Sequence, residues 1–588
     1  MDRNLLIAFT LSFLVLLTWN AMLQPSPEEQ AAAERAAAEE QARAADAEPG
    51  GPTPAPADQA DRFGDLPDAE PAEVLPEQAR RSQPTEALPP ATQLPIDRNL
   101  YDAVLTTRGG ALEGWELKSY VDGYGDPVAL VENGSGPGAV AHTPFLELGA
   151  GDLSREEWRV VEETPDGVAF AIERGGVHLR KAWTFDPDGY GFRLRIDVEN
   201  GSSAPVQPRF LVDWPARARD DNDFKEQSFA LLEDGEVERM PVNGVGNPGF
   251  FGFFTGDSGQ DHYDYEGEID WAGVESTYFV SALIPDSPAQ ASARVAVIER
   301  SRVGATQVFF DPVTLPPGQT LTREFRGYVG PKEADRLEAM EGGLDRSIDL
   351  GWSWVAPLTR GFNWLLQVLY SFIPNYGIAI ILLTILVRVV TAPLTVKQMK
   401  SMERLRRVQP RMKEIQEKYA DDKQKQSEEL MRLYRQEKVN PLGGCFPMLL
   451  QLPVFIGLFY ALRSSISLRQ APFFGWIDDL SAPEALFEIP GLGLPVRVLP
   501  LIMGATMFLQ QKITPMQTPD PAQARMMMTV MPVMMTVLFY QFPSGLVLYW
   551  MLSNVLAIAH QLWIGRNMGP PAAPAAPAGS GSPEPKAA

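Results

Sequence analysis

A single basic residue interrupts an uncharged run in the C-terminal half of the chain. Arg388 lies near the middle of YGIAIILLTILVRVVTAPLTV (376–396), and the other long apolar runs contain no acidic residue except Asp2, which stands next to Arg3 at the start of the chain. A charge at the centre of a membrane segment costs about 2.5 to 3.5 kcal/mol on insertion scales, so such a residue usually has a function. The sequence therefore predicts that Arg388 meets water, lipid headgroups or a substrate. The alternative is that its side chain snorkels to the membrane surface.

Uncharged polar residues occur in the same run and in neighbouring ones. They are Thr384, Gln451, Gln510, Gln511, Ser553 and Asn554. If these side chains converge on Arg388, they line a hydrated groove within the membrane. The alternative is that each one forms a hydrogen bond between packed helices.

Other kinds of site chemistry have little support in the sequence. The single cysteine, Cys445, and the four histidines lack the spacing of metal ligands or of a disulfide framework. There is no phosphate-binding loop of the form GxxxxGK[ST]. Residues 24–350 contain 60 acidic and 28 basic residues, which argues against nucleic-acid binding by this half. We therefore expect no cofactor, no metal site and no catalytic site.

Six apolar runs are long enough, or nearly long enough, to cross a membrane. They are 1–23, 376–396, 443–463, 497–512, 526–541 and 544–564. The first follows Arg3 and lacks a cleavage site, which favours a retained signal anchor. The fourth and fifth are shorter than the ~20 residues that a bilayer requires, which predicts local thinning of the lipid or burial among other helices.

The charges of the loops predict the orientation. Loop 397–440 carries 13 basic and 8 acidic residues, whereas loop 464–496 carries one arginine and four acidic residues. Because loops rich in Lys and Arg remain in the cytoplasm, the first loop is predicted to be cytoplasmic and the second to lie outside, on the other side of the membrane. Both chain ends, loop 513–525 and a disordered tail at 565–588 are then cytoplasmic, and residues 24–350 lie outside.

The external half divides into a linker and a β-rich domain. Residues 24–96 are rich in Ala, Pro, Glu and Gln and cannot bury enough apolar surface to become ordered. Within 97–335, apolar and charged residues alternate from Phe192 to Glu199 after the turn DPDG, and the pattern returns at 321–329. This alternation predicts an antiparallel β-sandwich.

Two further segments are predicted to be helices at the membrane surface. Segment 352–373 is rich in Trp among aliphatic residues, which is typical of an interfacial amphipathic helix, and the alternative is a plain tether. Segment 397–440 has apolar residues at three- and four-residue steps on both sides of Asp421 and Asp422, which predicts a helical hairpin. Its basic residues are expected to contact headgroups, ribosomal RNA or nascent chains, and the alternative is a solvated helix pair whose basic residues face only water. These residues are Lys397, Lys400, Arg404, Arg406, Arg407, Arg411 and Lys413.

Three segments closely resemble the YidC/Oxa family of membrane protein insertases, in particular its Gram-negative type with a large periplasmic domain. They are EKVNPLGGCFPMLLQLPVF (437–455), LRQAPFFGWIDDLSA (468–482) and FPSGLVLYWMLSN (542–554), supported by the opening MDRNLLIAF. The resemblance implies a non-enzymatic protein that inserts and folds nascent proteins in the inner membrane, alone or with the Sec translocon. It further implies six transmembrane helices, five of which form a groove open to cytoplasm and lipid, and a periplasmic β-supersandwich.

The resemblance also implies roles for individual residues. Arg388 matches the essential groove arginine of the family, Thr384 a groove threonine and Gln451 a groove glutamine. Trp550, beside Tyr549, stands where the family often has a tyrosine that contacts substrate, and Asn554 completes the predicted groove. The tail lacks the basic segment of many relatives, so any contact with the ribosome or the signal recognition pathway is expected at the hairpin.

Two other functions fit parts of the sequence. An anion transporter could use Arg388 as its binding charge, but it should show internal repeats among its spans, which are not evident. A membrane-anchored carbohydrate-active protein should retain its activity when residues 24–350 are released alone.

Overall fold

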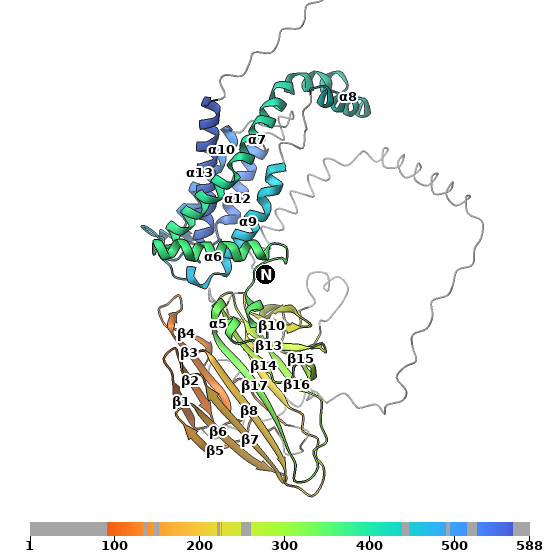
Figure 1. The fold of residues 1–588 in the computed structure, drawn as a ribbon, viewed down its shortest axis with the longest axis vertical. Helices are drawn as coiled ribbons and strands as arrows, with labels where there is room; N and C mark the ends of the chain where they lie inside the picture. The colour runs from red at the N-terminus through yellow and green to blue at the C-terminus, as the bar shows by residue number, and fades with distance from the viewer. Residues whose placement is uncertain are drawn as a thin grey trace, which may run out of the picture. The chain divides into compact units, whose positions relative to one another are not determined.

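The computed structural model describes residues 91–132, 139–145, 148, 152–219, 224, 226–247, 260–420, 422–437, 446–489, 494–513 and 526–567 (Figure 1). The predicted first span (1–23), most of the predicted linker (24–96) and the tail after Asn567 lie outside these residues. The described chain contains a β-rich part followed by a helical part, and each has an apolar core of its own.

Among the residues that the structure describes, the β-rich part contains three antiparallel sheets. Their strand orders are β1-β2-β3-β4, β11-β10-β13-β14-β17-β8-β7-β6-β5 and β12-β15-β16-β9. The strands are β1 (Gln93–Asp97), β2 (Tyr101–Thr106), β3 (Ala111–Val121), β4 (Pro127–Val131), β5 (Arg159–Thr164), β6 (Gly167–Arg174), β7 (Val177–Phe185), β8 (Gly191–Asn200), β9 (Leu211–Arg217), β10 (Ser228–Glu233), β11 (Glu236–Pro241), β12 (His262–Tyr265), β13 (Ile269–Glu275), β14 (Phe279–Pro285), β15 (Ala291–Glu299), β16 (Val303–Phe310) and β17 (Thr320–Pro331).

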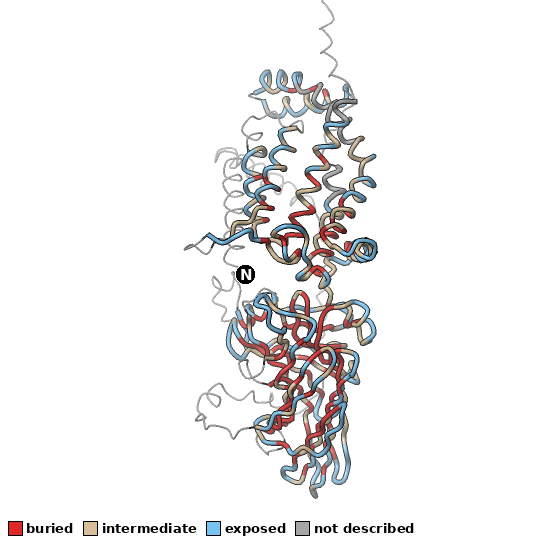
Figure 2. The backbone as a smooth tube through the Cα atoms, turned by 90° about the vertical axis from the view of Figure 1, so that its left-hand side faces the viewer, coloured by how far each residue is buried: buried red, intermediate tan, exposed pale blue. Residues whose placement is uncertain are grey.

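Period-two patterning determines which side chains enter the core of these sheets. On β8, Leu194 and Ile196 are fully buried whereas Arg193 and Arg195 are exposed, as the alternation in the sequence predicts. Four tryptophans from different strands or loops are almost completely buried: Trp115, Trp158, Trp183 and Trp271. In Figure 2 the buried residues accordingly run along the strands. The prediction of a β-sandwich domain is confirmed.

The first strand begins before the predicted start of the domain at residue 97. β1 runs from Gln93 to Asp97 and pairs with β2, and Ile96 is buried. Pro95 continues the proline-rich composition of the preceding segment, so composition alone does not indicate a strand here. A proline is nevertheless compatible with a strand at the edge of a sheet, and β1 is an edge strand.

The helical part contains seven main helices among the described residues. They are α6 (Ala356–Phe372), α7 (Tyr376–Lys418), α8 (Lys423–Gln436), α9 (Phe446–Ser464), α10 (Val498–Ile513), α12 (Met531–Phe539), which follows a π-helical turn at Met526–Val530, and α13 (Ser544–Asn567). Asn375 caps α7, because its side chain accepts a hydrogen bond from the backbone N–H of Ile378 at 3.0 Å. Helix α7 continues without a break from the predicted second span (376–396) into the first helix of the predicted hairpin. These two predicted elements are thus one 43-residue helix.

The turn between α7 and α8 ends at Asp422, whose side chain accepts a hydrogen bond from the N–H of Lys425 at 3.0 Å. Val408 and Met412 of α7 pack with Leu433 of α8 in a small core of their own. The apolar stripes of both helices thus face each other.

Two helical segments among the described residues are long and apolar enough to cross a membrane, Tyr376–Val396 and Ser544–Trp563. Three others are apolar but shorter: Leu452–Ser464, Val498–Ile513 and Met528–Phe539. Because an α-helix rises 1.5 Å per residue, a 16-residue helix spans less than the ~30 Å of a hydrocarbon core. The predicted number of six spans is therefore not established by helix length.

Large apolar side chains are exposed on these helices. The most exposed include Val389 and Val390 on α7 (64% and 69%) and Val533 and Val537 on α12 (61% and 65%). Figure 2 shows exposed positions all along the helices. Apolar surface of this extent is expected where helices face lipid rather than water.

Candidate functional site

Arg388 binds a neighbouring helix through its guanidinium group. Its Nη2 donates a hydrogen bond to the backbone carbonyl of Ser553 on α13 at 2.8 Å. Helices α7 and α13 pack side by side (Figure 1). The arginine forms no ion pair within the described part of the chain, and it remains partly exposed. The other four N–H donors of the guanidinium form no hydrogen bond to the described residues and can meet water or a polar ligand.

The periodicity of α7 separates a polar face from an apolar face. Thr384, Arg388 and Thr391 follow one another at four- and three-residue steps, so they share a face of the helix. Leu386 and Val390 belong to the opposite, exposed face. This arrangement directs the charge towards α13 and directs aliphatic side chains towards the surroundings.

Thr384 is completely buried one turn before Arg388. Its hydroxyl donates to the carbonyl of Ile380 at 2.6 Å, within the same helix. The donor of this threonine is thus satisfied, and its oxygen can still accept a hydrogen bond.

The paired aromatic residues of α13 are packed between helices. Tyr549 is buried. The ring of Trp550 lies edge-on to Phe455 of α9, with centroids 4.7 Å apart, and 4.9 Å from Phe539 of α12. Trp550 therefore connects three helices and shapes the site through packing.

A polar residue that the sequence analysis missed lies on α10. The side-chain amide of Asn554 donates to the hydroxyl of Thr506 at 3.5 Å, and Thr506 itself donates to the carbonyl of Met503 at 2.7 Å. Thr506 is a polar residue within the apolar run of the fourth predicted span, one turn before Gln510, and this position was the available signal. Five polar residues of the neighbouring helices α7, α10 and α13 are referred to together as the polar layer: Arg388, Thr384, Thr506, Ser553 and Asn554.

Two polar atoms near this layer have no hydrogen-bond partner among the described residues. They are the hydroxyl oxygen of Ser553 and the amide oxygen of Gln511 on α10, and both are buried. A buried polar group without a partner costs roughly 1 to 3 kcal/mol. Such atoms favour the entry of water or of a polar substrate group.

The remaining predicted residues are only partly described. The side chains of Gln451, Lys397, Lys400, Arg404, Arg406 and Arg407 lie outside the described residues, although all six belong to helices α7 or α9. Arg411 forms an ion pair with Glu437 across the hairpin, and Lys413 is exposed. Lys413 is therefore better placed than Arg411 to contact a partner.

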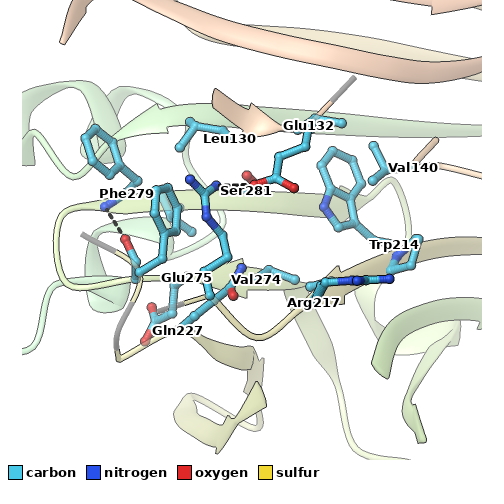
Figure 3. Close-up of a pocket in the computed structure, with 17 residues that line it drawn as sticks. Leu130, Glu132, Val140, Trp214, Arg217, Gln227, Val274, Glu275, Phe279 and Ser281 are labelled. Atoms are coloured by element: carbon cyan, nitrogen blue, oxygen red, sulfur yellow. Dashed lines mark hydrogen bonds and ion pairs between the residues drawn. The ribbon is translucent and has the colours of Figure 1, made fainter. Parts of the chain in front are cut away.

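The sandwich contains a pocket where its three sheets meet (Figure 3). Its wall includes Trp214 of β9 and two acidic residues, Glu132 and Glu275. Glu132 lies 3.4 Å from Arg219, and Glu275 is paired at 3.0 Å with Lys332. Glycoside hydrolysis requires one protonated and one free carboxyl group. Since cations hold both carboxylates here, the pocket is poorly suited to that chemistry. The described residues also contain no cluster of three potential metal ligands.

Comparison with known proteins covers both parts of the chain. The family model described as "YidC periplasmic domain" matches residues 93–365, and the one described as "60Kd inner membrane protein" matches residues 368–570. The membrane protein insertase YidC of Pelobacter propionicus is 36% identical over 82% of this chain and 90% of its own length. The same protein of Syntrophus aciditrophicus is 35% identical over 82% of this chain and 86% of its own length.

A solved structure titled as an active YidC insertase with its first transmembrane domain resolved is also similar. It shares 18% identity, with a TM-score of 0.33, over 80% of this chain and 94% of that chain. The two relatives and the two family models show a stronger similarity to this chain than the solved structure does. They do not support the alternative of an anion transporter or of a carbohydrate-active protein.

Proposed function

The chain belongs to the YidC family of membrane protein insertases and is thus a non-enzymatic inner-membrane protein that inserts nascent membrane proteins. From this premise we propose that the polar layer around Arg388 receives the tail of the substrate that must cross the membrane. The observation that carries this proposal is a guanidinium group that binds α13 through one N–H and has no acidic partner among the described residues.

The physical problem of insertion is the loss of hydration. A polar tail that crosses about 30 Å of hydrocarbon must give up its hydrogen bonds to water, which is costly for each group. The polar layer offers replacement donors and acceptors partway across. Arg388 attracts an acidic tail, while the apolar segment of the substrate leaves sideways into lipid, driven by burial worth about 25 cal/mol per Å². No nucleotide is required.

We propose that the five apolar segments of the helical part cross the membrane together with segment 1–23, six spans in all. The short helices α10 and α12 then imply a locally thin bilayer, since mismatch is relieved by lipid deformation. A thin bilayer lowers the free-energy barrier to moving a polar tail across the hydrocarbon. The polar layer lowers the same barrier. Both termini are placed in the cytoplasm and residues 24–350 in the periplasm, in agreement with the charges of the loops.

The predicted roles of the other residues complete this proposal. Gln451, Tyr549, Trp550 and Asn554 contribute to the groove, and the exposed base Lys413 with its neighbours on the hairpin contacts headgroups or nascent chain. We further propose that the protein cooperates with the Sec translocon, as the resemblance to the family implies, and that a ribosome contact forms at the hairpin rather than at the tail.

Crosslinking of a stalled nascent chain tests the proposal. The substrate is a single-span protein with a photoreactive residue either in its translocated tail or in its apolar segment. The tail probe is expected to label α7 near Arg388 and α13 near Ser553, and the apolar probe to label exposed aliphatic positions. Tail labelling confined to the exposed face at Val389 and Val390 would contradict the proposed site.

A further inference from the structure

The segment between α9 and α10 folds against the ends of the helices. It contains a short 3-10 turn (Ile466–Leu468) and the strands β18 (Phe487–Ile489) and β19 (Leu494–Val496). Three of its side chains, Leu468, Ile477 and Leu480, are buried in the same apolar core as Ile380 of α7 and Leu546 of α13. We call residues 465–489 the apolar loop.

Backbone contacts join the apolar loop to the first turn of α13. The hydroxyl of Ser544 donates to the carbonyl of Asp479 at 2.7 Å, and its backbone N–H donates to the carbonyl of Ala482 at 2.8 Å. The N–H of Gly545 donates to the carbonyl of Leu480 at 2.9 Å. A side chain at position 545 would begin 3.0 Å from that carbonyl, so glycine permits the close approach.

Glu484 joins the same loop to the first turn of α10. Its side chain is buried, with 6% exposure. One carboxylate oxygen accepts a hydrogen bond from the backbone N–H of Leu499 at 2.7 Å, and the other accepts one from the indole N–H of Trp476 at 2.7 Å. Leu499 is the second residue of α10, where an anion is favoured by the unpaired N–H groups of the helix.

These contacts place Glu484 above the polar layer. Thr506 follows Leu499 by seven residues, which is roughly 10 Å along the helix axis. Asn554, its partner on α13, follows Ser544 by ten residues, or roughly 15 Å. The apolar loop is bonded to the first turns of both helices. It therefore covers the end of the helix group beyond Thr506 and Asn554 and sets the positions of α10 and α13 relative to each other.

We infer that Glu484 is a positioning residue for insertion: it holds the apolar loop closed over the periplasmic end of the polar layer. This inference rests on the proposed function and on the proposed orientation, in which the loop is periplasmic. With the loop closed, water and ions reach Arg388 from one side only, so that a hydrated groove does not become a channel.

Both hydrogen-bond partners of Glu484 are N–H donors. A side chain that offers only one acceptor oxygen therefore tests the inference. In Glu484→Gln the amide oxygen can face only one donor, and the amide NH2 must face the other. In the double variant Glu484→Gln with Trp476→Phe the indole donor is absent, so the amide oxygen can bind Leu499 without a clash of donors. The double variant is therefore expected to behave better than the single variant.

The measurements use the full-length protein in lipid vesicles that contain a trapped pH-sensitive dye. Glu484→Gln is expected to raise the proton leak about tenfold, the factor that corresponds to one lost hydrogen bond to a charged group, and to reduce insertion of a single-span substrate. Adding Trp476→Phe should reduce the proton leak most of the way to that of the unaltered protein. Glu488→Gln, a matched change on exposed β18, should leave both readouts unchanged.

The inference is overturned if Glu484→Gln resembles Glu488→Gln in leak and insertion. It is also overturned if Glu484→Gln merely lowers the amount of folded protein and Trp476→Phe restores nothing. Failure of the proposed function would look different, because insertion by the unaltered protein would then not depend on Arg388 while the leak of the Glu484 variant still rose.

Discussion

Arg388 is both a charge and a link between helices. The hydrogen bond from Nη2 to the carbonyl of Ser553 holds the guanidinium near α13. That bond is single rather than a two-pronged contact with a carboxylate, so the geometry does not require the planar fork of arginine. A lysine at this position could keep the charge and donate one hydrogen bond.

Replacement of Arg388 should therefore show whether insertion depends on its positive charge or on the planar shape of its guanidinium group. Arg388→Ala is expected to slow insertion of substrates with Asp in the translocated tail about tenfold, since one attraction of about 1.4 kcal/mol is lost. Neutral tails should be affected less, and Arg388→Lys should restore most of the rate. The measurement is reconstituted insertion of one single-span substrate with either tail. Equal slowing of both tails by Ala, or a Lys variant as poor as Ala, would argue for a structural role instead.

Two buried basic groups lie together inside the sandwich. Lys181 on β7 is fully buried, and its Nζ donates to the carbonyl of Ala141 at 2.6 Å and of Gly109 at 3.2 Å. Burial lowers the pKa of Lys181 to about 7. Burial and the nearby Lys181 lower the pKa of His142 to about 4, and its backbone pairs with Asp213. No carboxylate contacts Lys181 among the described residues.

Mild acid should destabilise the sandwich through His142. Its folded-state pKa of about 4 lies below the ordinary value of 6.5, so the unfolded chain binds the proton more readily. The stability associated with neutral His142 is complete above pH 6.5 and is lost as the pH falls towards 4, with a slope of up to ~1.4 kcal/mol per pH unit. His142→Asn should remove this slope of the free energy of unfolding against pH. The measurement is unfolding in urea, with proteolysis of the unfolded chain as the readout. His178→Asn, at an exposed position, should preserve it. A slope retained in His142→Asn would assign the pH dependence to other groups.

At the scale of elements, α10 and α12 approach each other through a glycine. A side chain at Gly504 of α10 would begin 2.0 Å from the hydroxyl of Thr536 on α12. That hydroxyl donates to the carbonyl of Pro532 at 2.8 Å, which fixes its position. The contact brings together the two shortest apolar helices of the proposed core.

Gly504→Ala should destabilise the helical part by about 1 to 3 kcal/mol, the usual cost of overpacking. Adding Thr536→Ala should recover most of the loss, because the nearest remaining atom, Cβ of residue 536, lies 3.3 Å away. Gly361→Ala on α6 meets open space and should be neutral or slightly stabilising. Thermal unfolding in detergent measures all three. No recovery in the double variant would mean that α12 does not pack on Gly504.

Local patterns predicted much of the fold, while contacts between distant segments could not be predicted. Alternation on β7 even places Lys181 inward between Leu179 and Trp183, although a lysine suggests a surface. Helix periodicity groups Thr384 with Arg388. The bonds from Glu484 to Trp476 and Leu499, and the contact of Asn554 with Thr506, depend on how loops and helices pack. No spacing in the sequence encodes them.

At the scale of the whole molecule, the chain separates two tasks. The sandwich core is built from residues 96 to 344, and the main helical core from residues 362 to 549. The polar layer and the hairpin both belong to the second part. The acidic first half contributes no described side chain to the polar layer, whose hydrogen bonds lie within α7, α10 and α13.

Insertion should therefore survive removal of most of the sandwich. A chain that joins residues 1–23 directly to 336–588 keeps every residue of the polar layer, the hairpin and the apolar loop, so it is expected to retain most of its insertion activity. The measurement compares insertion of one single-span substrate by this shortened chain and by the full chain, at equal protein levels in vesicles. The same shortened chain with Arg388→Ala serves as the control and should lose activity on acidic tails. Complete loss of insertion by a shortened chain that is present at a normal level would show that the sandwich takes part in the reaction, because the polar layer itself would be intact.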